Sequence, residues 1–241
     1  EEEPCYWGVI KMRNHEVTSA QPLLNEEGRI PEPGWARRPV WQYDRNRIAS
    51  PKFRIKERDY YLVLNPDYAC GFTLSDEGHV GFQSVSVLNF KEGWEHTETI
   101  LNSFPMGRMK MPFSSGEDKR LRMEFRKEDA RHFISCDFKD FWQGKQFYCE
   151  LSLEQPEMDI LAVAVPWTEK KAFYYNQKII GMKARGQAEF GGQIYEFRPE
   201  DSFGLLDWGR GVWTYHNTWY WSAAMGRAGD GEFGFNLGYG F

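Results

Sequence analysis

The sequence predicts an all-β protein, and three observations support this prediction. Aromatic residues make up 17% of the 241 residues, and rings of this kind are enriched in β-strands. Glycine is frequent, with 23 residues, and it supplies the tight turns and bulges that many short strands require. Short strand-like runs follow one another between turn signals, and no segment carries a long apolar stripe of helical period with caps.

The first well-defined elements are a strand and a hairpin. Arg58–Leu64 has the composition of a strand that ends at the turn residues Asn65–Asp67. Tyr68–Leu74 is expected to pair with His79–Leu88 across a turn that ends at Gly78. Glycine supplies the positive φ that such a tight turn needs, so the spacing predicts a β-hairpin.

Similar runs continue through the middle of the chain. The expected strands are Leu121–Arg126, Arg131–Phe138, Gln146–Leu153, Leu161–Val165 and, as a hairpin or an irregular strand, Phe173–Ala184. Even spacing of this kind is typical of barrels and sandwiches. Glu92–Asn102 is the one segment that suggests a short helix, although its glycine and threonines weaken that interpretation.

The chain divides most naturally near Pro166–Lys171, where a proline and polar residues interrupt two strand regions. We therefore expect an N-terminal arm over residues 1–34 and a first β-barrel-like domain over residues 35–166. Residues 167–241 are expected to begin a second β-barrel-like domain. The arm is rich in turn residues, which favours an extended conformation.

Charge and composition argue against nucleic-acid binding. The formal net charge is −5 and the pI is about 5.7. A protein that neutralises phosphates needs a basic excess, and this sequence has only local basic clusters such as Lys52–Arg58. Clusters of this kind are usually solvated faces.

No run of residues is long enough to cross a bilayer as a helix. The longest apolar run, Ile160–Trp167, has eight residues, whereas a spanning helix needs about twenty. The N-terminus opens with three glutamates and lacks the apolar segment of a signal peptide, so we expect a cytoplasmic protein. Met12 could mark a start position, which would make residues 1–11 an extension or a tag remnant.

Cysteine and histidine spacing gives no metal or redox motif. The four cysteines, at positions 5, 70, 136 and 149, form no CxxC pair, and we expect reduced, mostly buried thiols. His79, His96 and His132 are too widely separated to predict a zinc site. A P-loop, a nucleophile elbow and a dinucleotide fingerprint are also missing, so neither a metal nor an organic cofactor is expected.

Aromatic, glycine and polar residues are concentrated near the C-terminus. Residues 203–222 contain four of the ten tryptophans, interleaved with polar side chains. Phe233–Phe241 then alternates strictly, so that one strand face would be aromatic and aliphatic and the other mostly glycine. A glycine face lets another ring or a ligand lie against the backbone.

Asp207 and Arg210 are the charged candidates for catalysis and ligand binding in this block. Asp207 lies between Leu206 and Trp208, where burial among apolar side chains would raise the pKa of its carboxyl and suit it to act as a general acid. It could equally pair with Arg210 or cap a turn. Arg210 lies between two glycines and could bind a ligand carboxylate through two hydrogen bonds, or it could brace a bulge through a salt bridge.

The remaining candidates would complete such a pocket. His216 or Tyr215 could exchange protons with Asp207, and Asn217 could contact a ligand. A lone histidine is more often a hydrogen-bonded packing residue. The tryptophans could form the floor of a pocket or fill the core, and core packing is the default for such a large side chain. Their density beside polar groups strengthens the case for a pocket. The candidate ligand-binding tryptophans are Trp208, Trp213, Trp219 and Trp221.

Several motifs resemble a known family. Leu23–Gly28 followed by Gly34–Pro39 is similar to the opening of the bacterial domain of unknown function 2804 family. Ser103–Gly107 and Asp207–Gly211 resemble its middle and late motifs. The resemblance covers the chain from about Pro22 onward. Members of the family run on past a C-terminal sequence of this kind, so the resemblance implies a further C-terminal portion with more strands.

This family is distantly similar to the lipocalin-like superfamily that includes carotenoid hydratases. The resemblance implies two antiparallel lipocalin-like β-barrels side by side, the second incomplete in this chain. In the hydratases, a segment rich in histidine and aspartate that ends in Trp-Gly lines the pocket. Asp207–Gly209 is the nearest match here, and it lacks the flanking histidines, which argues against a shared reaction.

Three functions remain open at this point. The first is an enzyme that binds a lipophilic small molecule and carries out acid–base hydration, isomerisation or cyclisation. The second is a lipocalin-like binding or carrier protein with the same pocket and no reaction. The third is an interaction domain whose exposed aromatic residues contact a protein partner. Fold analogy does not decide between them, because one fold supports many functions.

Overall fold

The computed structural model describes residues 15–109, 113–114, 119–169 and 171–240. Two short 3-10 helices, η1 (Arg45–Arg47) and η2 (Lys52–Arg54), precede the first long strand. The strands are β1 (Gln21–Pro22), β2 (Gly34–Ala36), β3 (Trp41–Gln42), β4 (Ile55–Leu64), β5 (Tyr68–Asp76), β6 (Val80–Asn89), β7 (Trp94–Ser103), β8 (Phe113–Ser114), β9 (Leu121–Glu128), β10 (Arg131–Trp142), β11 (Lys145–Glu154), β12 (Leu161–Pro166), β13 (Phe173–Phe190), β14 (Gln193–Phe197), β15 (Phe203–Val212), β16 (Tyr220–Ala228) and β17 (Gly231–Tyr239).

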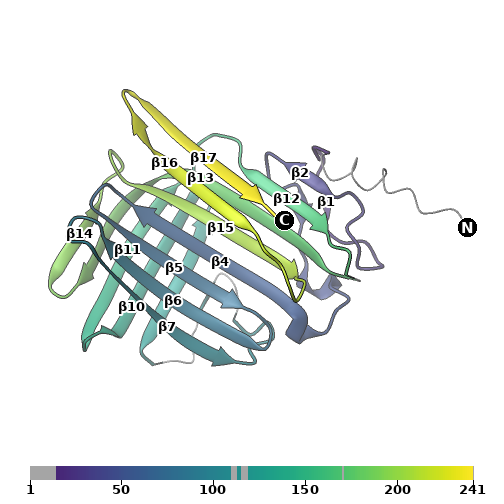
Figure 1. Ribbon diagram of the computed structural model, residues 1–241, viewed down its shortest axis with the longest axis horizontal. Helices are drawn as coiled ribbons and strands as arrows, with labels where there is room; N and C mark the ends of the chain where they lie inside the picture. The colour runs from purple at the N-terminus through teal and green to yellow at the C-terminus, as the bar shows by residue number, and fades with distance from the viewer. Residues whose placement is uncertain (1–14, 110–112, 115–118, 170, 241) are drawn as a thin grey trace, which may run out of the picture.

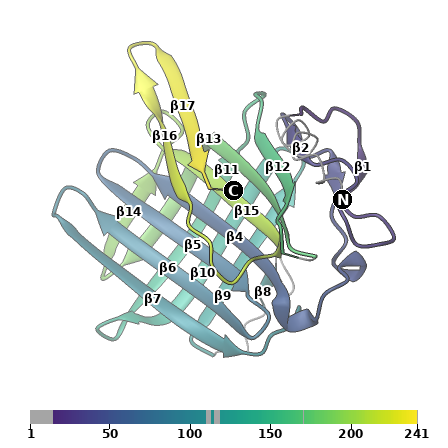
Figure 2. The same cartoon turned by 45° about the vertical axis from the view of Figure 1, so that its right-hand side comes forward.

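One large antiparallel sheet dominates the molecule. Its strand order is β7-β6-β5-β4-β15-β13-β11-β10-β9-β8; β12 and β14 also pair with β13, and β2 pairs with β12. The sheet curls into a half-barrel, as Figures 1 and 2 show from two directions. The predicted all-β, antiparallel class is therefore confirmed. Within the described residues, no helix is long and apolar enough to cross a membrane.

The predicted hairpin between β5 and β6 is present. Asp76 pairs with Gly81, and Gly78 has φ +81° in the turn between them. A side chain at Gly78 would collide with the backbone of Phe53, so glycine is required by both conformation and space. The expected strands in the middle of the chain are also present, as β9, β10, β11 and β12.

The short helix expected at Glu92–Asn102 is wrong, because this segment forms strand β7. Its residues alternate between partly buried and exposed positions, and they pair with β6 along the whole strand. Thr97, Thr99 and Ile100 are β-branched, which favours a strand over a helix. Ser84 and Ser86 on β6 meet the two threonine hydroxyls across the ladder.

Phe173–Ala184, expected as a hairpin or an irregular strand, is part of the single long strand β13. Its pairing with β15 shifts register between Ile179 and Met182. Because β13 has 18 residues, it can pair with β15 and β12 near its start and with β11 and β14 near its end. Strands on both sides of residue 166 therefore share one sheet; the predicted division of the chain there stays a prediction.

The inner face of the curled sheet forms the main apolar core. Its members include large, fully buried aromatic side chains from distant strands, such as Phe72, Phe125 and Phe147. Cys70, Cys136 and Cys149 are buried free thiols in this core, as expected, whereas Cys5 lies outside the described residues. A second, smaller core joins the N-terminal segment to β12 and β13.

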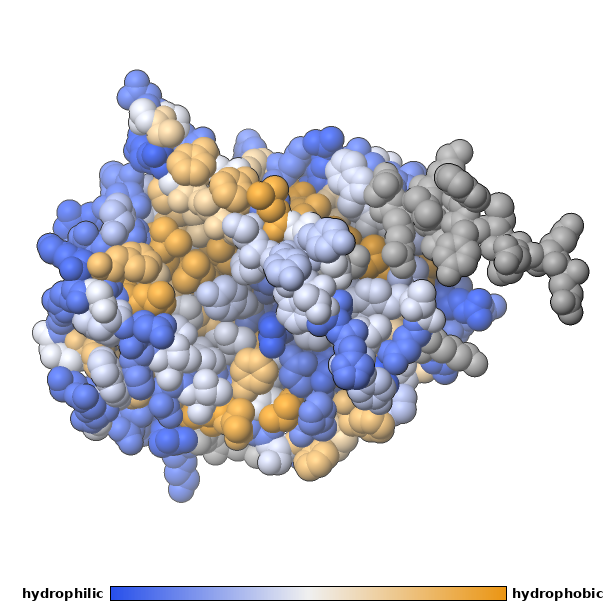
Figure 3. Space-filling model, in the orientation of Figure 1, coloured by the Kyte–Doolittle hydropathy of each residue, from blue (hydrophilic) through white to orange (hydrophobic). Residues whose placement is uncertain are grey.

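The C-terminal strands β16 and β17 form a separate hairpin that lies across β13 (Figures 1 and 2). The predicted alternation holds within β17: Gly234 lies against Ile180 of β13, and Phe233 and Phe235 on the other face are exposed. Figure 3 shows apolar residues gathered along this hairpin. Phe241, the last residue of the predicted strand, lies outside the described residues.

Candidate functional site

Strand β15 lies at the centre of the candidate site and separates its residues onto two faces. Asp207 pairs in register with Tyr60 of β4 on one side and with Lys178 of β13 on the other. Directly opposed residues in an antiparallel ladder point to the same face, and neighbours along a strand point to opposite faces. The face that carries Asp207 lies under the β16–β17 hairpin, and we call it the outer face.

Lys178 and Asp207 form a partly buried ion pair on the outer face. Lys178 Nζ lies 2.6 Å from Asp207 Oδ1, and the lysine side chain is only 4% exposed. Asn176 Nδ2 donates hydrogen bonds to the same carboxylate oxygen at 2.7 Å and to the backbone oxygen of Trp208 at 2.8 Å. The ammonium also lies 4.4 Å from the ring centroid of Trp221, which covers it from the hairpin.

Burial changes the proton affinities around this pair. It lowers the pKa of Lys178 from its usual value, and the nearby Asp207 carboxylate opposes that shift. It also raises the pKa of Tyr60 and of Tyr174, in both cases with a further contribution from the charge of Asp207. Burial and the Asp207 carboxylate therefore act in opposite directions on the pKa of Lys178.

A cleft of about 170 Å³ opens beside the ion pair. The residues that line it are Arg58, Trp167, Tyr174, Lys178, Asp207, Gly209, Trp213, Thr214, Tyr215, Asn217 and Trp219. Trp167 stacks on Tyr174 with ring centroids 5.9 Å apart, and Trp213 meets Tyr174 edge-on at the same separation. Aromatic walls around a few polar groups are typical of small-molecule sites.

Gly209 leaves room for the neighbouring rings of Tyr174 and Trp213 and for the cleft between them. A Cβ at this position would lie 3.5 Å from the Tyr174 ring and 3.7 Å from the Trp213 ring, so any longer side chain would enter the cleft. Because Gly209 lies on the same face of β15 as Asp207, the missing side chain leaves a hollow next to the carboxylate. This explains why aromatic and glycine residues occur together in this part of the sequence.

The segment between β15 and β16 forms one wall of the cleft. Arg54 Nη2 donates a hydrogen bond to the backbone oxygen of Trp213 at 2.9 Å, and its guanidinium lies 4.0 Å from the centroid of the Tyr215 ring. Tyr215 is nevertheless 71% exposed and Trp219 is 46% exposed. The wall is thus fixed at Trp213 and increasingly open to solvent beyond it.

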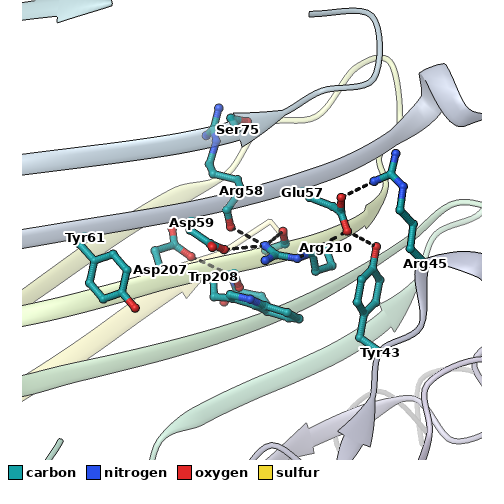
Figure 4. A network of polar contacts seen from close by, with 12 residues as sticks. Tyr43, Arg45, Glu57, Arg58, Asp59, Tyr61, Ser75, Asp207, Trp208 and Arg210 are labelled. Carbon is teal, nitrogen blue, oxygen red and sulfur yellow. Dashed lines mark hydrogen bonds and ion pairs between the residues drawn. The ribbon is translucent and has the colours of Figure 1, made fainter. Parts of the chain in front are cut away.

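A different polar network occupies the inner face (Figure 4). Arg210 Nη1 lies 2.7 Å from Asp59 Oδ1, in an ion pair without the alignment of a hydrogen bond. It donates to the backbone oxygens of Arg58 and Gly209, both at 2.9 Å. Its Nε lies 3.9 Å from Glu57, which also accepts a hydrogen bond from Tyr43 at 2.8 Å.

Trp208 belongs to this inner network. The Arg210 guanidinium lies 4.1 Å from the centroid of the Trp208 ring. Tyr43 and Tyr175 meet the same ring edge-on, with centroid separations of 6.0 and 5.1 Å. Arg45 forms a further ion pair with Glu57. Arginine and tryptophan therefore stabilise each other inside the sheet, away from the outer cleft.

The structure brings together five of the nine residues predicted for the site. Asp207, Trp213, Tyr215, Asn217 and Trp219 line the outer cleft. The other four are placed differently: Trp208 and Arg210 lie on the inner face, Trp221 covers Lys178 from the hairpin, and the His216 side chain is exposed and outside the cleft lining. Asp207 thus takes its polar contacts from Asn176 and Lys178 rather than from the predicted partners.

The main residues that sequence reasoning missed are Lys178 and Asn176 on β13 and Arg58 on β4. Lys178 directly precedes two isoleucines in a strand-forming run, and a charged residue in such a run needs a partner when it is buried. That signal marks the lysine as unusual. It does not identify Asp207 as the partner, because the two residues are 29 positions apart and meet only through strand pairing.

The described histidines do not form a metal site. His96 stacks on Trp142 at 4.6 Å, and His132 Nδ1 lies 2.8 Å from the Tyr61 hydroxyl. Within the described part of the chain, no group of three or more histidine, cysteine, aspartate or glutamate side chains could hold a metal ion. Burial lowers the pKa of His132 to about 4, so it is a neutral core residue near pH 7.

Comparison with known proteins gives one family and several distant structures. The model of the family described as Domain of unknown function (DUF2804) matches residues 14–241. None of the curated proteins matches the sequence. Kievitone hydratase from Nectria haematococca shares 13% identity with a TM-score of 0.44, over 77% of this chain and 61% of that chain.

Two further solved structures are similar at the same level. A protein provisionally assigned as AttH from Nitrosomonas europaea shares 11% identity with a TM-score of 0.45, over 76% of this chain and 61% of that chain. CghA shares 9% identity with a TM-score of 0.41, over 87% of this chain and 57% of that chain. The chain spans about three fifths of the length of these structures.

Proposed function

The chain belongs to the family Domain of unknown function (DUF2804), and for this member we propose an enzyme that binds a lipophilic small molecule in the outer cleft. The observation that carries the proposal is the Lys178–Asp207 ion pair, which lies at the edge of an aromatic cleft. A buried ion pair alone is weak evidence for function, since structural pairs are common. Here both charged groups also line a cleft, where a bound molecule can reach them.

The walls support a lipophilic and at least partly planar ligand. Trp167, Tyr174 and Trp213 present ring surfaces to the cleft, and Trp219, which is partly exposed, lines it as well. Rings contribute large apolar contact areas and stack on flat ligands. The cleft therefore favours a small molecule with a flat, conjugated or cyclic carbon body.

Acid–base chemistry is the reaction class that fits the two charged groups. Asp207 would accept a proton from the substrate, and the Lys178 ammonium would return one at another atom, so that no net proton is gained or lost. Proton removal and return describe an isomerisation directly. Hydration and cyclisation need the same acid and base, with water or a group of the substrate as the nucleophile.

A non-catalytic carrier with the same cleft is the second candidate. The exposure of Tyr215 and Trp219 favours it, because an open wall releases cargo easily and excludes water poorly. The two candidates share the ligand class and differ only in whether the ligand is changed. One set of variants can therefore separate them.

The test begins with the molecule that the protein retains when it is purified gently from its source cells. That molecule, identified by native mass spectrometry and extraction, is offered to the wild type and to Asp207→Asn. We expect the wild type to convert it and Asp207→Asn to be slower by roughly 10²–10⁴-fold, the usual contribution of a general acid or base. Asp230→Asn, which changes an exposed carboxylate in the hairpin turn, is the matched control.

A second variant locates the binding site. Gly209→Leu should fill the cleft and abolish binding, since even a Cβ here touches two rings. Retained binding in Gly209→Leu would disprove the outer cleft as the site. If the wild type and the variants bind the molecule but none of them converts it, the result contradicts the enzyme and supports the carrier.

A further inference from the structure

Two buried N–H groups on residues of the outer cleft have no hydrogen-bond partner among the residues that the structure describes. They are Nε of Arg58 and Nε1 of Trp213, and both residues line the cleft. Buried donors in folded proteins are nearly always paired, so an unpaired group calls for an explanation. Two such donors beside one cleft indicate that the missing partner is a hydrogen-bond acceptor of the ligand.

Arg58 is placed to meet a ligand because it faces the hollow at Gly209. The two residues are paired in register between β4 and β15, so the arginine side chain shares the outer face with a position that has no side chain. Its guanidinium lies 5.3 Å from the centroid of the Phe82 ring and 5.8 Å from that of Trp213. These rings fix the direction of the arginine without using its donors.

The positive charge of Arg58 is only partly neutralised by nearby carboxylates. Its one described ion pair is with Glu77, at 3.6 Å, and Glu77 is shared with Lys56 at 3.2 Å. Lys178 and Asp207 neutralise each other at 2.6 Å. Among the described residues that line the cleft, Arg58, Lys178 and Asp207 are the charged ones, so this part of the lining carries an excess of one positive charge near Arg58.

We propose that the cleft binds a molecule with a carboxylate head group, held by Arg58 and the Trp213 indole N–H. This proposal rests on the proposed function and specifies its substrate class: an aromatic or otherwise lipophilic body that ends in a carboxylate. A planar carboxylate matches the donor geometry of a guanidinium and can accept from both unpaired donors. The ring body would then lie between Tyr174 and Trp219, with its reactive carbon toward Asp207.

The experiment compares two ligands that differ only in charge. Binding of 2-naphthoate and of 2-naphthylmethanol, which have the same ring system, is measured by titration calorimetry at pH 7.5. We expect the wild-type protein to bind the carboxylate at least roughly tenfold more tightly than the alcohol, because hydrogen bonds to ionised groups are the stronger kind. Equal affinities for the two probes would overturn the proposal.

Variants then assign the preference to the two donors. Arg58→Gln should remove this preference for the carboxylate over the alcohol, and Arg58→Lys should retain part of it, because the charge remains. Trp213→Phe should weaken carboxylate binding by roughly threefold through the loss of one neutral donor. Arg131→Gln, on an exposed arginine of β10, is the control. A preference that survives Arg58→Gln in full would also overturn the proposal.

Gly209→Leu separates this proposal from the proposed function. If this variant binds both probes as the wild type does, the probes bind elsewhere, which overturns both proposals. If it loses both probes and the wild type shows no preference for charge, the cleft remains a ligand site and only the carboxylate subsite is overturned.

Discussion

The two faces of the sheet at β15 carry the same kinds of residue, a cation, a carboxylate and a tryptophan. They differ in whether a ligand can reach these residues. On the inner face, Arg210 contacts Asp59 and Glu57, and all three are buried; the partly buried Trp208 ring packs against the guanidinium. On the outer face, Lys178 contacts Asp207, and the pair lies beside an open aromatic cleft. A cation, a carboxylate and a tryptophan therefore do not define a functional site. Access for a ligand does.

Neighbouring residues of the motif at positions 207–210 have different roles, because they lie on different faces of the sheet. Residues 207 and 209 face the cleft, whereas residues 208 and 210 face the core, because side chains alternate along a strand. The inner residues hold β15 against β4 and the N-terminal segment through Glu57 and Tyr43. Changes on the inner face should therefore act on stability, and changes on the outer face should act mainly on binding.

Removal of Arg210 should have the largest effect on stability. Arg210→Met keeps much of the side-chain volume and leaves the carboxylates of Asp59 and Glu57 without their shared cation. We expect a loss of about 3–5 kcal/mol in the free energy of unfolding, typical of a broken buried ion pair. Urea denaturation measures it. Arg37→Met removes exposed ion pairs and should change stability far less; equal losses in the two variants would contradict a large contribution of the buried Arg210 network to stability.

Acid should destabilise the protein through His132, a histidine enclosed on the inner side of the sheet. Its pKa falls from 6.5 to about 4 on folding, because burial disfavours the charged ring. As pH drops below about 6.5 the unfolded chain binds the proton first, so stability decreases progressively until about pH 4. The total loss from this group is about 3 kcal/mol.

The measurement is the difference in unfolding free energy between the wild type and His132→Asn across this pH range. That difference should shrink with acid, since the variant lacks the titrating ring. His216→Asn, which changes an exposed histidine of the outer wall, is the control and should follow the wild type throughout. A constant difference for His132→Asn would show that the buried ring is not the acid-sensitive group.

The sequence predicted most of the strands because turns and alternation are local features. The hairpin at Gly78 and the alternating strand β17 follow from a few neighbouring residues. The wrong helix at β7 shows the limit: a glycine and several polar residues gave no clear period, and pairing with β6 decided the outcome. Local preference alone could not supply that long-range contact.

The part of the chain that lines the outer cleft was predictable from the sequence, and the cleft's full set of lining residues was predictable only in part. The density of tryptophan and glycine pointed to the segment that contains Asp207 and Trp213. Strict alternation over residues 203–212 would have separated Asp207 from Arg210, which are three positions apart and therefore on opposite faces. Lys178 and Arg58 come from strands that β15 meets only in the folded sheet. A local pattern marks Lys178 as unusual, but no pattern within one segment shows that Lys178 and Arg58 meet β15.

Breaking the outer ion pair should cost less than breaking the inner network. Asp207→Asn should reduce stability by about 1–2 kcal/mol, below the usual range for buried pairs, because the Asp207 side chain is 22% exposed and water partly replaces the lost contact. In the double variant Asp207→Asn with Lys178→Gln, the unpaired ammonium is also removed. We therefore expect the double variant to be more stable than Asp207→Asn alone.

A double-mutant cycle built from urea denaturation measures this coupling. If the two single variants and the double variant give additive losses, the pair contributes no interaction energy and its 2.6 Å contact is incidental. If the outer pair instead proves as costly to break as Arg210, then both faces serve stability, and the difference between them would lie only in access to the cleft. The expected result lies between these limits: a measurable coupling, smaller than the loss in Arg210→Met, at a position where the charge remains available to a ligand.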